Sequence, residues 1–321
     1  LAADESTNTI TKRFSDIKLE SNFENRRKYR ELLFTSENLN KFISGVILYD
    51  ETIKQSTSDG ISFSKYLTDQ DIIPGIKVDT GAIPIEPNSE EKITEGLDNL
   101  GKRLIEYKKL GASFTKWRAI INIDKSKKIP TNYSIELNSY NLARYAKIVQ
   151  ENEMVPIVEP EILMDGSHSI DECFEATSKT QKILFEKLDL HSVDLSGIIL
   201  KPNMIISGKK CTDQANVNKV ASMTLRCLEE NVPKEVPGIM FLSGGQSNEI
   251  ATEHLNEINK LSSNNSWNLS FSYGRALQQP CLNAWRGKDE NISDSQKALI
   301  KRSRLNSFAT KGEYVVDLEK S

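Results

Sequence analysis

The sequence has few of the residues that bind metal ions or form disulfides. In 321 residues there are four cysteines and three histidines, no two cysteines form a CxxC pair, and the histidines show no ligand spacing. Metal sites need three or four clustered His, Cys or acidic ligands, so we expect no metal site. Scattered cysteines without a pairing pattern are typical of free, buried thiols, which we expect of Cys173, Cys211, Cys227 and Cys281.

Long apolar runs and an excess of positive charge are also missing. No segment approaches the ~18 consecutive apolar residues of a membrane helix, and the opening LAADESTNT lacks the basic flank and apolar core of a signal peptide. The formal net charge is −3, so we expect the basic run at 125–128 to be a solvated loop. The sequence predicts a cytoplasmic protein that neither inserts into membranes nor binds nucleic acid.

Short apolar runs recur along the chain and alternate with segments of helical apolar spacing, such as 96–111 and 140–153. Strands that alternate with helices form parallel βαβ units covered by helices. Eight such units match a (β/α)8 TIM barrel, an α/β fold with a parallel eight-stranded barrel and outer helices, in one domain over 1–321. A doubly wound open sheet is the alternative, but no GxGxxG follows a predicted strand. The predicted strands begin at residues 1, 43, 74, 114, 154, 197, 238 and 269.

One of these runs, GIILKPN at 197–203, carries a lysine into its apolar end. Its β-branched residues are typical of a strand buried on both faces, where an unpaired charge is costly. The position of the charged Lys201 side chain therefore needs a physical explanation. One reason is that its ammonium group reaches water from the strand end. The other is that the lysine takes part in chemistry.

Charged residues gather at the predicted carboxyl ends of the strands, where TIM barrels have their active sites. Residues two apart in a strand share a face, so each pair at these ends projects to one side. Salt bridges that only close the barrel mouth are an alternative, but buried ion networks add little stability where apolar packing would serve. We therefore expect chemistry from the cations Lys77, Lys116, Arg118, Lys201 and Arg275 and the carboxylates Asp4, Asp79, Glu159 and Glu161.

Two glycine-containing motifs, LSGGQS at 242–247 and SYGR at 272–275, follow the last two predicted strands. Adjacent glycines let backbone N–H groups form an anion site, and Arg275 adds a fork that matches phosphate oxygens. Many TIM barrels bind phosphate at these two loops, so we expect a phosphorylated substrate. A buried lysine attacks a ketone to form a Schiff base when burial and a neighbouring cation, here Lys116, favour the neutral amine. The motif VEPE at 158–161 supplies an acid for the loss of water.

Taken in order, these motifs resemble those of class I fructose-1,6-bisphosphate aldolase, the Schiff-base enzyme of glycolysis. The resemblance covers essentially the whole chain, and so long a series of motifs is highly specific. It rests on LAADES, SGVILYDET, GIKVD, KWR, VPIVEPEIL, ILKPN, FLSGGQS and SYGRALQ.

The resemblance implies a lyase that reversibly cleaves fructose 1,6-bisphosphate to dihydroxyacetone phosphate and glyceraldehyde 3-phosphate, in glycolysis and gluconeogenesis, without metal or organic cofactor. It assigns Lys201 as the Schiff-base lysine, Glu159 as the acid of carbinolamine dehydration and Asp4 as the group that moves the C4-hydroxyl proton. By the same resemblance, Lys116 stabilises charge on the intermediates and Glu161 holds the local charge balance. The ketone-half phosphate is expected at Ser243, Gly244, Gly245, Gly274 and Arg275, and the other phosphate near Ser6, Thr9, Lys77 and Arg118.

The chain departs from the family in three ways. The family's N-terminal helix before LAADES is absent from the sequence, which begins at Leu1. The family's mobile C-terminal tail, which ends in tyrosine, is absent as well. Thr9 stands where many members have serine, which keeps the hydroxyl. If the truncations are real, we expect slower cleavage with intact Schiff-base chemistry.

The family is usually a homotetramer, and its members also contact cytoskeletal and adhesin-type partners, so the resemblance implies both for this chain. Two other functions stay open: a Schiff-base lyase or transferase acting on a different sugar phosphate, and a binding or scaffolding role. The intact motifs KWR, VEPE and LKPN favour catalysis. A preference between fructose 1,6-bisphosphate and fructose 1-phosphate also stays open.

Overall fold

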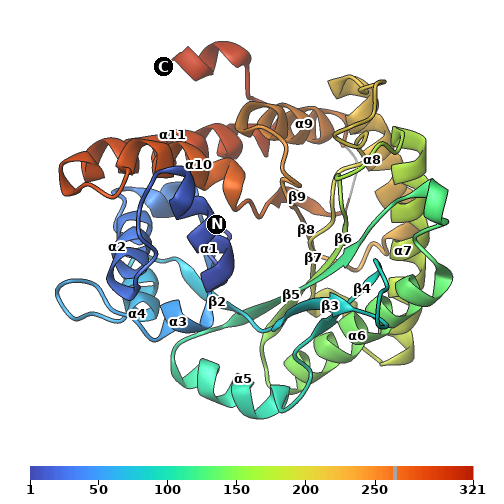
Figure 1. Ribbon diagram of the computed structural model, residues 1–321, viewed down its shortest axis with the longest axis horizontal. Coiled ribbons are helices and arrows are strands. Elements are labelled where there is room, and N and C mark those ends of the chain that lie inside the picture. The colour runs from blue at the N-terminus through green and yellow to red at the C-terminus, as the bar shows by residue number, and fades with distance from the viewer. Residues whose placement is uncertain (263–265, 321) are drawn as a thin grey trace.

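The computed structural model describes residues 1–262 and 266–320. Its main sheet has seven strands in the order β1-β2-β5-β6-β7-β8-β9, and neighbours in this order pair in parallel. Helices form an outer ring around these strands (Figure 1). The strands are Gly45–Leu48 (β1), Ile73–Lys77 (β2), Phe114–Ile121 (β5), Val155–Ile162 (β6), Ile199–Leu200 (β7), Gly238–Phe241 (β8) and Asn268–Phe271 (β9).

The first residues of the chain close this sheet into a barrel. Ala2 forms a parallel bridge with Ile47 of β1, and the Ala2 nitrogen donates to the carbonyl oxygen of Tyr273, just after β9, at 3.0 Å. The strand predicted at residue 1 is therefore only a single bridge, but it takes the eighth place in the barrel. The predicted (β/α)8 fold is confirmed, and Asp4 follows this bridge at the carboxyl ends of the strands.

Several helices begin after a residue whose side chain accepts from one of their first N–H groups. The Thr131 hydroxyl accepts from the Ser134 N–H at the start of α6, and Ser169 and Glu172 form a capping box at the start of α7. The helices are α1 (Thr7–Asp16), α2 (Phe23–Phe34), α3 (Asp50–Ile53), α4 (Phe63–Asp69), α5 (Leu100–Lys109), α6 (Asn132–Glu151), α7 (Ile170–Leu190), α8 (Val217–Asn231), α9 (Asn248–Leu261), α10 (Arg275–Trp285) and α11 (Ile292–Ala309). In the described part of the chain, none of them has the length and apolar character needed to cross a membrane.

Two features differ from the expectations. The helix expected at 140–153 begins at Asn132, because Thr131 caps it well before the apolar spacing becomes regular. A short antiparallel hairpin, β3 (Gly81–Pro84) with β4 (Lys92–Glu95), follows β2 outside the main sheet. Most of its residues are exposed or half-buried, so the hairpin adds little to the barrel core.

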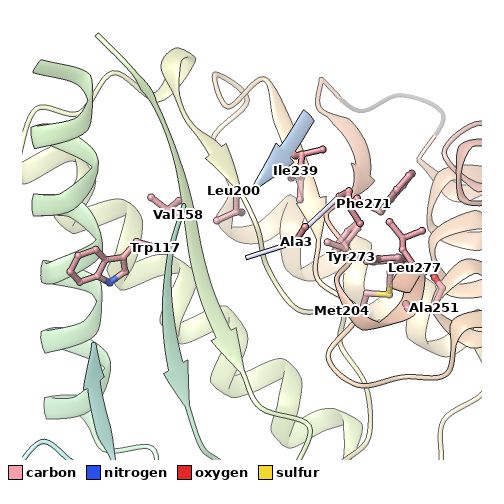
Figure 2. Packing of buried hydrophobic residues seen from close by; sticks show 14 of the residues in the cluster. Ala3, Trp117, Val158, Leu200, Met204, Ile239, Ala251, Phe271, Tyr273 and Leu277 are labelled. Atoms are coloured by element: carbon pink, nitrogen blue, oxygen red, sulfur yellow. Dashed lines mark hydrogen bonds between the residues drawn. The ribbon is translucent and has the colours of Figure 1, made fainter. Parts of the chain in front are cut away.

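Along each strand, side chains point alternately outward to the core beneath the helices and inward to the barrel interior. Trp117 of β5 is fully buried and points toward α6 (Figure 2), where its ring lies 5.4 Å from that of Tyr145. Val158 and Leu200 are buried in the same apolar cluster. Because neighbouring residues in a strand point to opposite faces, the residues on either side of Trp117 project away from α6.

Gly96, which follows β4, has no room for a side chain. Its φ is +126°, and a Cβ there would lie 3.0 Å from both the Thr80 nitrogen and the Val78 carbonyl oxygen. Because these are backbone atoms, we expect Gly96→Ala to lower the free energy of unfolding by about 1–3 kcal/mol. The matched control is Gly101→Ala in α5, where the nearest atom to an added Cβ is 3.9 Å away and alanine favours the helix. Thermal unfolding compares the two, and an equal melting temperature for both variants would contradict this account.

Candidate active site

A polar cavity of about 620 Å³ opens at the carboxyl ends of the barrel strands. Its lining comes from the ends of β2, β5 and β6, from the segments after β7, β8 and β9, and from the start of the chain. All the site residues predicted from the sequence line this one cavity: Asp4, Ser6, Thr9, Lys77, Lys116, Arg118, Glu159, Glu161, Lys201, Ser243, Gly244, Gly245, Gly274 and Arg275.

A second cavity, of about 320 Å³, lies at the opposite, amino-terminal ends of the strands. Its described lining includes apolar residues such as Ile73, Phe114 and Val155 but no ionisable side chain. Acid–base and nucleophilic catalysis need ionisable groups. We therefore place the candidate active site in the polar cavity.

The alternation along β5 and β6 directs charged side chains into the polar cavity. Trp117 packs against α6, so Lys116 and Arg118 project to the other side. Glu159 and Glu161 share a face of β6 and line the same cavity. Arg118 forms an ion pair with Glu161, so the two strands contribute complementary charges.

Lys116 is the centre of a buried ion network. Its Nζ lies 2.8 Å from Asp4 Oδ2, and two more carboxylates face it, Glu159 at 3.5 Å and Asp79 at 3.7 Å. Burial alone would lower the pKa of Lys116, but these carboxylates raise it well above its usual range. Burial also opposes ionisation of Asp4, yet Lys116 and Lys201 hold the pKa of its carboxyl well below its usual range. At neutral pH, Lys116 is therefore an ammonium and Asp4 a carboxylate.

Glu159 lies between two lysines. Its Oε1 is 3.1 Å from Lys201 Nζ, and its Oε2 is 3.5 Å from Lys116 Nζ. Lys201 follows β7 directly, and its N–H donates to the Val158 carbonyl oxygen at 2.8 Å, which continues the pairing with β6. Lys201 is 4% exposed. The alternative in which its ammonium group reaches water is therefore wrong, because the group is buried against a carboxylate.

A further ion pair joins Lys77 and Asp79, with Nζ and Oδ1 2.5 Å apart. Like Arg118 and Glu161, these two residues form a salt bridge, as expected if the charges only close the mouth of the barrel. However, the pairs line an open cavity of about 620 Å³ instead of filling it. The network therefore does not merely close the mouth of the barrel.

The loops after β8 and β9 bring a glycine turn and a guanidinium group together in the cavity. Gly244 and Gly245 both have left-handed backbone, with φ of +57° and +79°, a conformation that favours glycine. A Cβ on Gly245 would lie 2.5 Å from Arg275 Nη2, so the guanidinium group approaches this turn directly. Gly274 precedes Arg275, the first residue of α10, and the start of a helix favours negative charge. The arrangement suits a phosphate group.

Hydroxyls and further cations also line the cavity. The Oγ atoms of Ser6 and Thr9, at the start of α1, lie 3.2 Å apart. Lys77 Nζ donates to the Asp79 carbonyl oxygen at 2.8 Å. These groups and Arg118 share the cavity with the glycine turn, so its lining holds donors for a second anionic group.

The cavity also contains charged residues that the sequence did not predict. Lys12 lies in α1, while Asp165 and Lys209 lie in the loops after β6 and β7. Loops have no periodic apolar pattern, and both loop residues lie beyond the strand ends where charges were sought. Their position after the carboxyl end of a barrel strand is the one signal that points to them.

The cysteines are free, and three of them are buried, while Cys211 is only half-buried, unlike the expectation. Burial raises the pKa of Cys173 to about 11 and that of Cys227 and Cys281 to about 12. A thiol binds metal as the thiolate, which burial disfavours here. Within 1–262 and 266–320, no group of three His, Cys, Asp or Glu side chains is arranged to hold a metal ion.

Comparison with known proteins identifies the family. Residues 1–321 match the family model described as fructose-bisphosphate aldolase class-I. The chain is 51% identical over 315 residues to a probable fructose-bisphosphate aldolase class 1 of Xanthomonas campestris pv. campestris, with 98% of this chain and 93% of that protein covered. It is 50% identical over 314 residues to fructose-bisphosphate aldolase of Plasmodium falciparum, with 98% and 85% covered.

A solved structure has the same fold. It is a ternary co-crystal structure of Plasmodium falciparum fructose-bisphosphate aldolase in complex with TRAP and a small-molecule inhibitor. Its TM-score with this chain is 0.96 at 50% sequence identity, and the match covers 98% of this chain and 90% of that chain. The chain belongs to the class I fructose-bisphosphate aldolases, a family of lyases.

Proposed function

We propose that this chain reversibly cleaves fructose 1,6-bisphosphate to dihydroxyacetone phosphate and glyceraldehyde 3-phosphate through a Schiff base on Lys201. The observation that carries the proposal is the buried pair of Lys201 Nζ and Glu159 Oε1, 3.1 Å apart, in a cavity with cations for two phosphates. Transfer of one proton across this pair leaves a free amine on Lys201. It also leaves a protonated acid on Glu159, which the next step needs.

The amine nitrogen of Lys201 then attacks the C2 carbonyl carbon of the substrate, and the product is a carbinolamine. Glu159 donates its proton to the C2 hydroxyl, the C–O bond breaks, water leaves and an iminium remains. Lys116 stays an ammonium in this network, so it stabilises negative charge that develops on nearby oxygens. Glu161, paired with Arg118, holds the local charge balance.

Asp4 completes the cleavage step. Its carboxyl is ionised at neutral pH because the pKa is held well below its usual range, so the carboxylate accepts the proton of the C4 hydroxyl. The C3–C4 bond breaks, its electron pair moves to the iminium, and the products are an enamine on Lys201 and the free aldehyde, glyceraldehyde 3-phosphate. Protonation at C3 and addition of water then release dihydroxyacetone phosphate and restore the lysine.

In this proposal the substrate is held by both of its phosphates. Charged hydrogen bonds from Arg275 and the glycine turn suit the phosphate of the ketone half. The donors around Ser6 suit the other phosphate. We assign the ketone-half phosphate to Ser243, Gly244, Gly245, Gly274 and Arg275, and the second phosphate to Ser6, Thr9, Lys77 and Arg118.

The proposal also covers the domain organisation, the oligomeric state, the location and the pathway of the enzyme. We propose that residues 1–321 act as one catalytic domain, that the protein is a cytoplasmic homotetramer, and that it works in glycolysis and gluconeogenesis; the family resemblance supports each point. A Schiff-base lyase or transferase for a different sugar phosphate is the catalytic alternative. A steady-state comparison of fructose 1,6-bisphosphate, fructose 1-phosphate and other sugar phosphates distinguishes these substrates.

A second role is favoured by the solved relative. The Plasmodium falciparum aldolase was crystallised in complex with TRAP, and we infer that this chain also binds adhesin-tail or cytoskeletal partners. Such binding is an addition to catalysis, since the charged groups of the catalytic cavity are all in place.

Trapping the iminium tests the covalent mechanism. Borohydride added with dihydroxyacetone phosphate should reduce the iminium to a secondary amine, inactivate the enzyme and add the triose phosphate to the peptide that contains ILKPNM. Lys201→Met should still bind phosphate but should lose turnover and labelling. The control Lys210→Met, which replaces an exposed lysine, should keep turnover and labelling. Mass spectrometry locates the label, and labelling of Lys116 or Lys77 instead would move the nucleophile to another strand.

Metal removal tests the absence of a metal cofactor. We expect EDTA to leave the cleavage rate unchanged, because the iminium on Lys201 withdraws electrons from the breaking bond in place of a metal ion. The measurement is the initial rate after dialysis against EDTA. A loss of activity that zinc restores would overturn the Schiff-base assignment.

A pull-down on immobilised TRAP tests the second role. We expect the wild-type chain and Lys201→Met to be retained equally, because partner binding does not need the Schiff base. No retention of the wild-type chain on TRAP or on filamentous actin would remove this proposed role and leave the catalytic one untouched.

A further inference from the structure

Lys209 is a charged residue of the cavity that the proposed mechanism does not use. It lies in the loop between β7 and α8 and lines the cavity together with Gly244 and Gly245. Its N–H donates to the Met164 carbonyl oxygen, and the next N–H along the loop donates to the Gly166 carbonyl oxygen, both at 2.8 Å. The loop is therefore fixed to the segment after β6, and the base of the lysine side chain is held in place.

The ammonium group of Lys209 lies beside the glycine turn. A Cβ on Gly245 would be 3.1 Å from Lys209 Nζ and 2.5 Å from Arg275 Nη2. Both cations thus approach the same backbone position, and both are within reach of an anion seated on this turn. Two cations on one phosphate match its double negative charge, which a single guanidinium group only partly neutralises.

Lys209 also has a partner among the protein's own side chains. Its Nζ lies 3.1 Å from Asp165 Oδ1, and the two side chains are 41% and 69% exposed. Exposed ion pairs contribute little stability because water screens them. The lysine is therefore held near the cavity but is easily released to a stronger anion.

We propose that Lys209 binds the ketone-half phosphate together with Arg275, and that it exchanges Asp165 for this phosphate when substrate binds. The inference rests on the proposed function, which places that phosphate at the glycine turn. Fructose 1,6-bisphosphate and fructose 1-phosphate both carry this phosphate. Lys209 therefore sets affinity for the phosphorylated ketone half and does not discriminate between the two sugars.

The experiment compares Lys209→Gln with Lys210→Gln. Lys210 is the next residue, is also exposed and lies outside the cavity lining, so both variants lose the same charge from the same loop. Isothermal titration with inorganic phosphate should show about tenfold weaker binding for Lys209→Gln, as for the loss of one charged hydrogen bond, and no change for Lys210→Gln. Lys209→Arg should keep the affinity of the wild type.

Kinetics provide a second measurement. For Lys209→Gln we expect KM to rise by the same factor for fructose 1,6-bisphosphate and fructose 1-phosphate, with kcat unchanged. Asp165→Asn should tighten phosphate binding, because the lysine then has no competing carboxylate; unchanged binding would contradict the exchange. Equal phosphate affinity of Lys209→Gln and Lys210→Gln would overturn the inference about Lys209.

Arg275→Ala separates this inference from the proposed function. If Arg275→Ala weakens phosphate binding and Lys209→Gln does not, the phosphate site stands and only the role of Lys209 is wrong. If neither variant changes phosphate affinity, the phosphate does not bind at the glycine turn, and the proposed substrate orientation fails together with the role of Lys209.

Discussion

The carboxylate of Glu159 is the group on which the centre of the site depends. It separates the ammonium groups of Lys201 and Lys116, at 3.1 and 3.5 Å, and none of the three residues is more than 4% exposed. Two like charges in this buried position would repel each other strongly without it, and a carboxylate alone would be costly to bury. The three charges therefore stabilise one another, and the proposed proton transfer between Glu159 and Lys201 depends on the same closeness.

The barrel holds these groups on rigid elements. Glu159 lies within β6, and Lys201 is bonded to the neighbouring Val158 through its backbone. At the start of the chain, Asp4 and Glu5 are adjacent but differ in their surroundings. Asp4 faces Lys116 in the cavity, whereas Glu5 is buried between two arginines of α1 and α2 and accepts from the Gln278 side chain. Glu5 thus fixes the segment that closes the barrel, and Asp4 is positioned as a consequence.

The sequence by itself determined the fold and the side of the barrel that carries the site. A period of two is a local property, so the strand KWR directs Lys116 and Arg118 to one face whatever surrounds it. Apolar runs alternating with helical segments are equally local, and they were enough to predict a (β/α)8 barrel with charges at its carboxyl ends. The helix of 140–153 was placed only in part, since its start depends on one capping residue, Thr131.

Only the tertiary structure decided which charges meet. The pairing of Glu159 with both lysines, the position of Lys209 beside Gly245, and the single bridge at Ala2 that closes the barrel all join residues far apart in the chain. Electrostatic and packing energies depend on distance in space, and these distances arise only when the barrel closes. No local pattern records these distances. The sequence therefore predicted the groups at the strand ends, with Lys116 and an acid of VEPE near Lys201, but not the ion pairs that they form or the loop cations beside them.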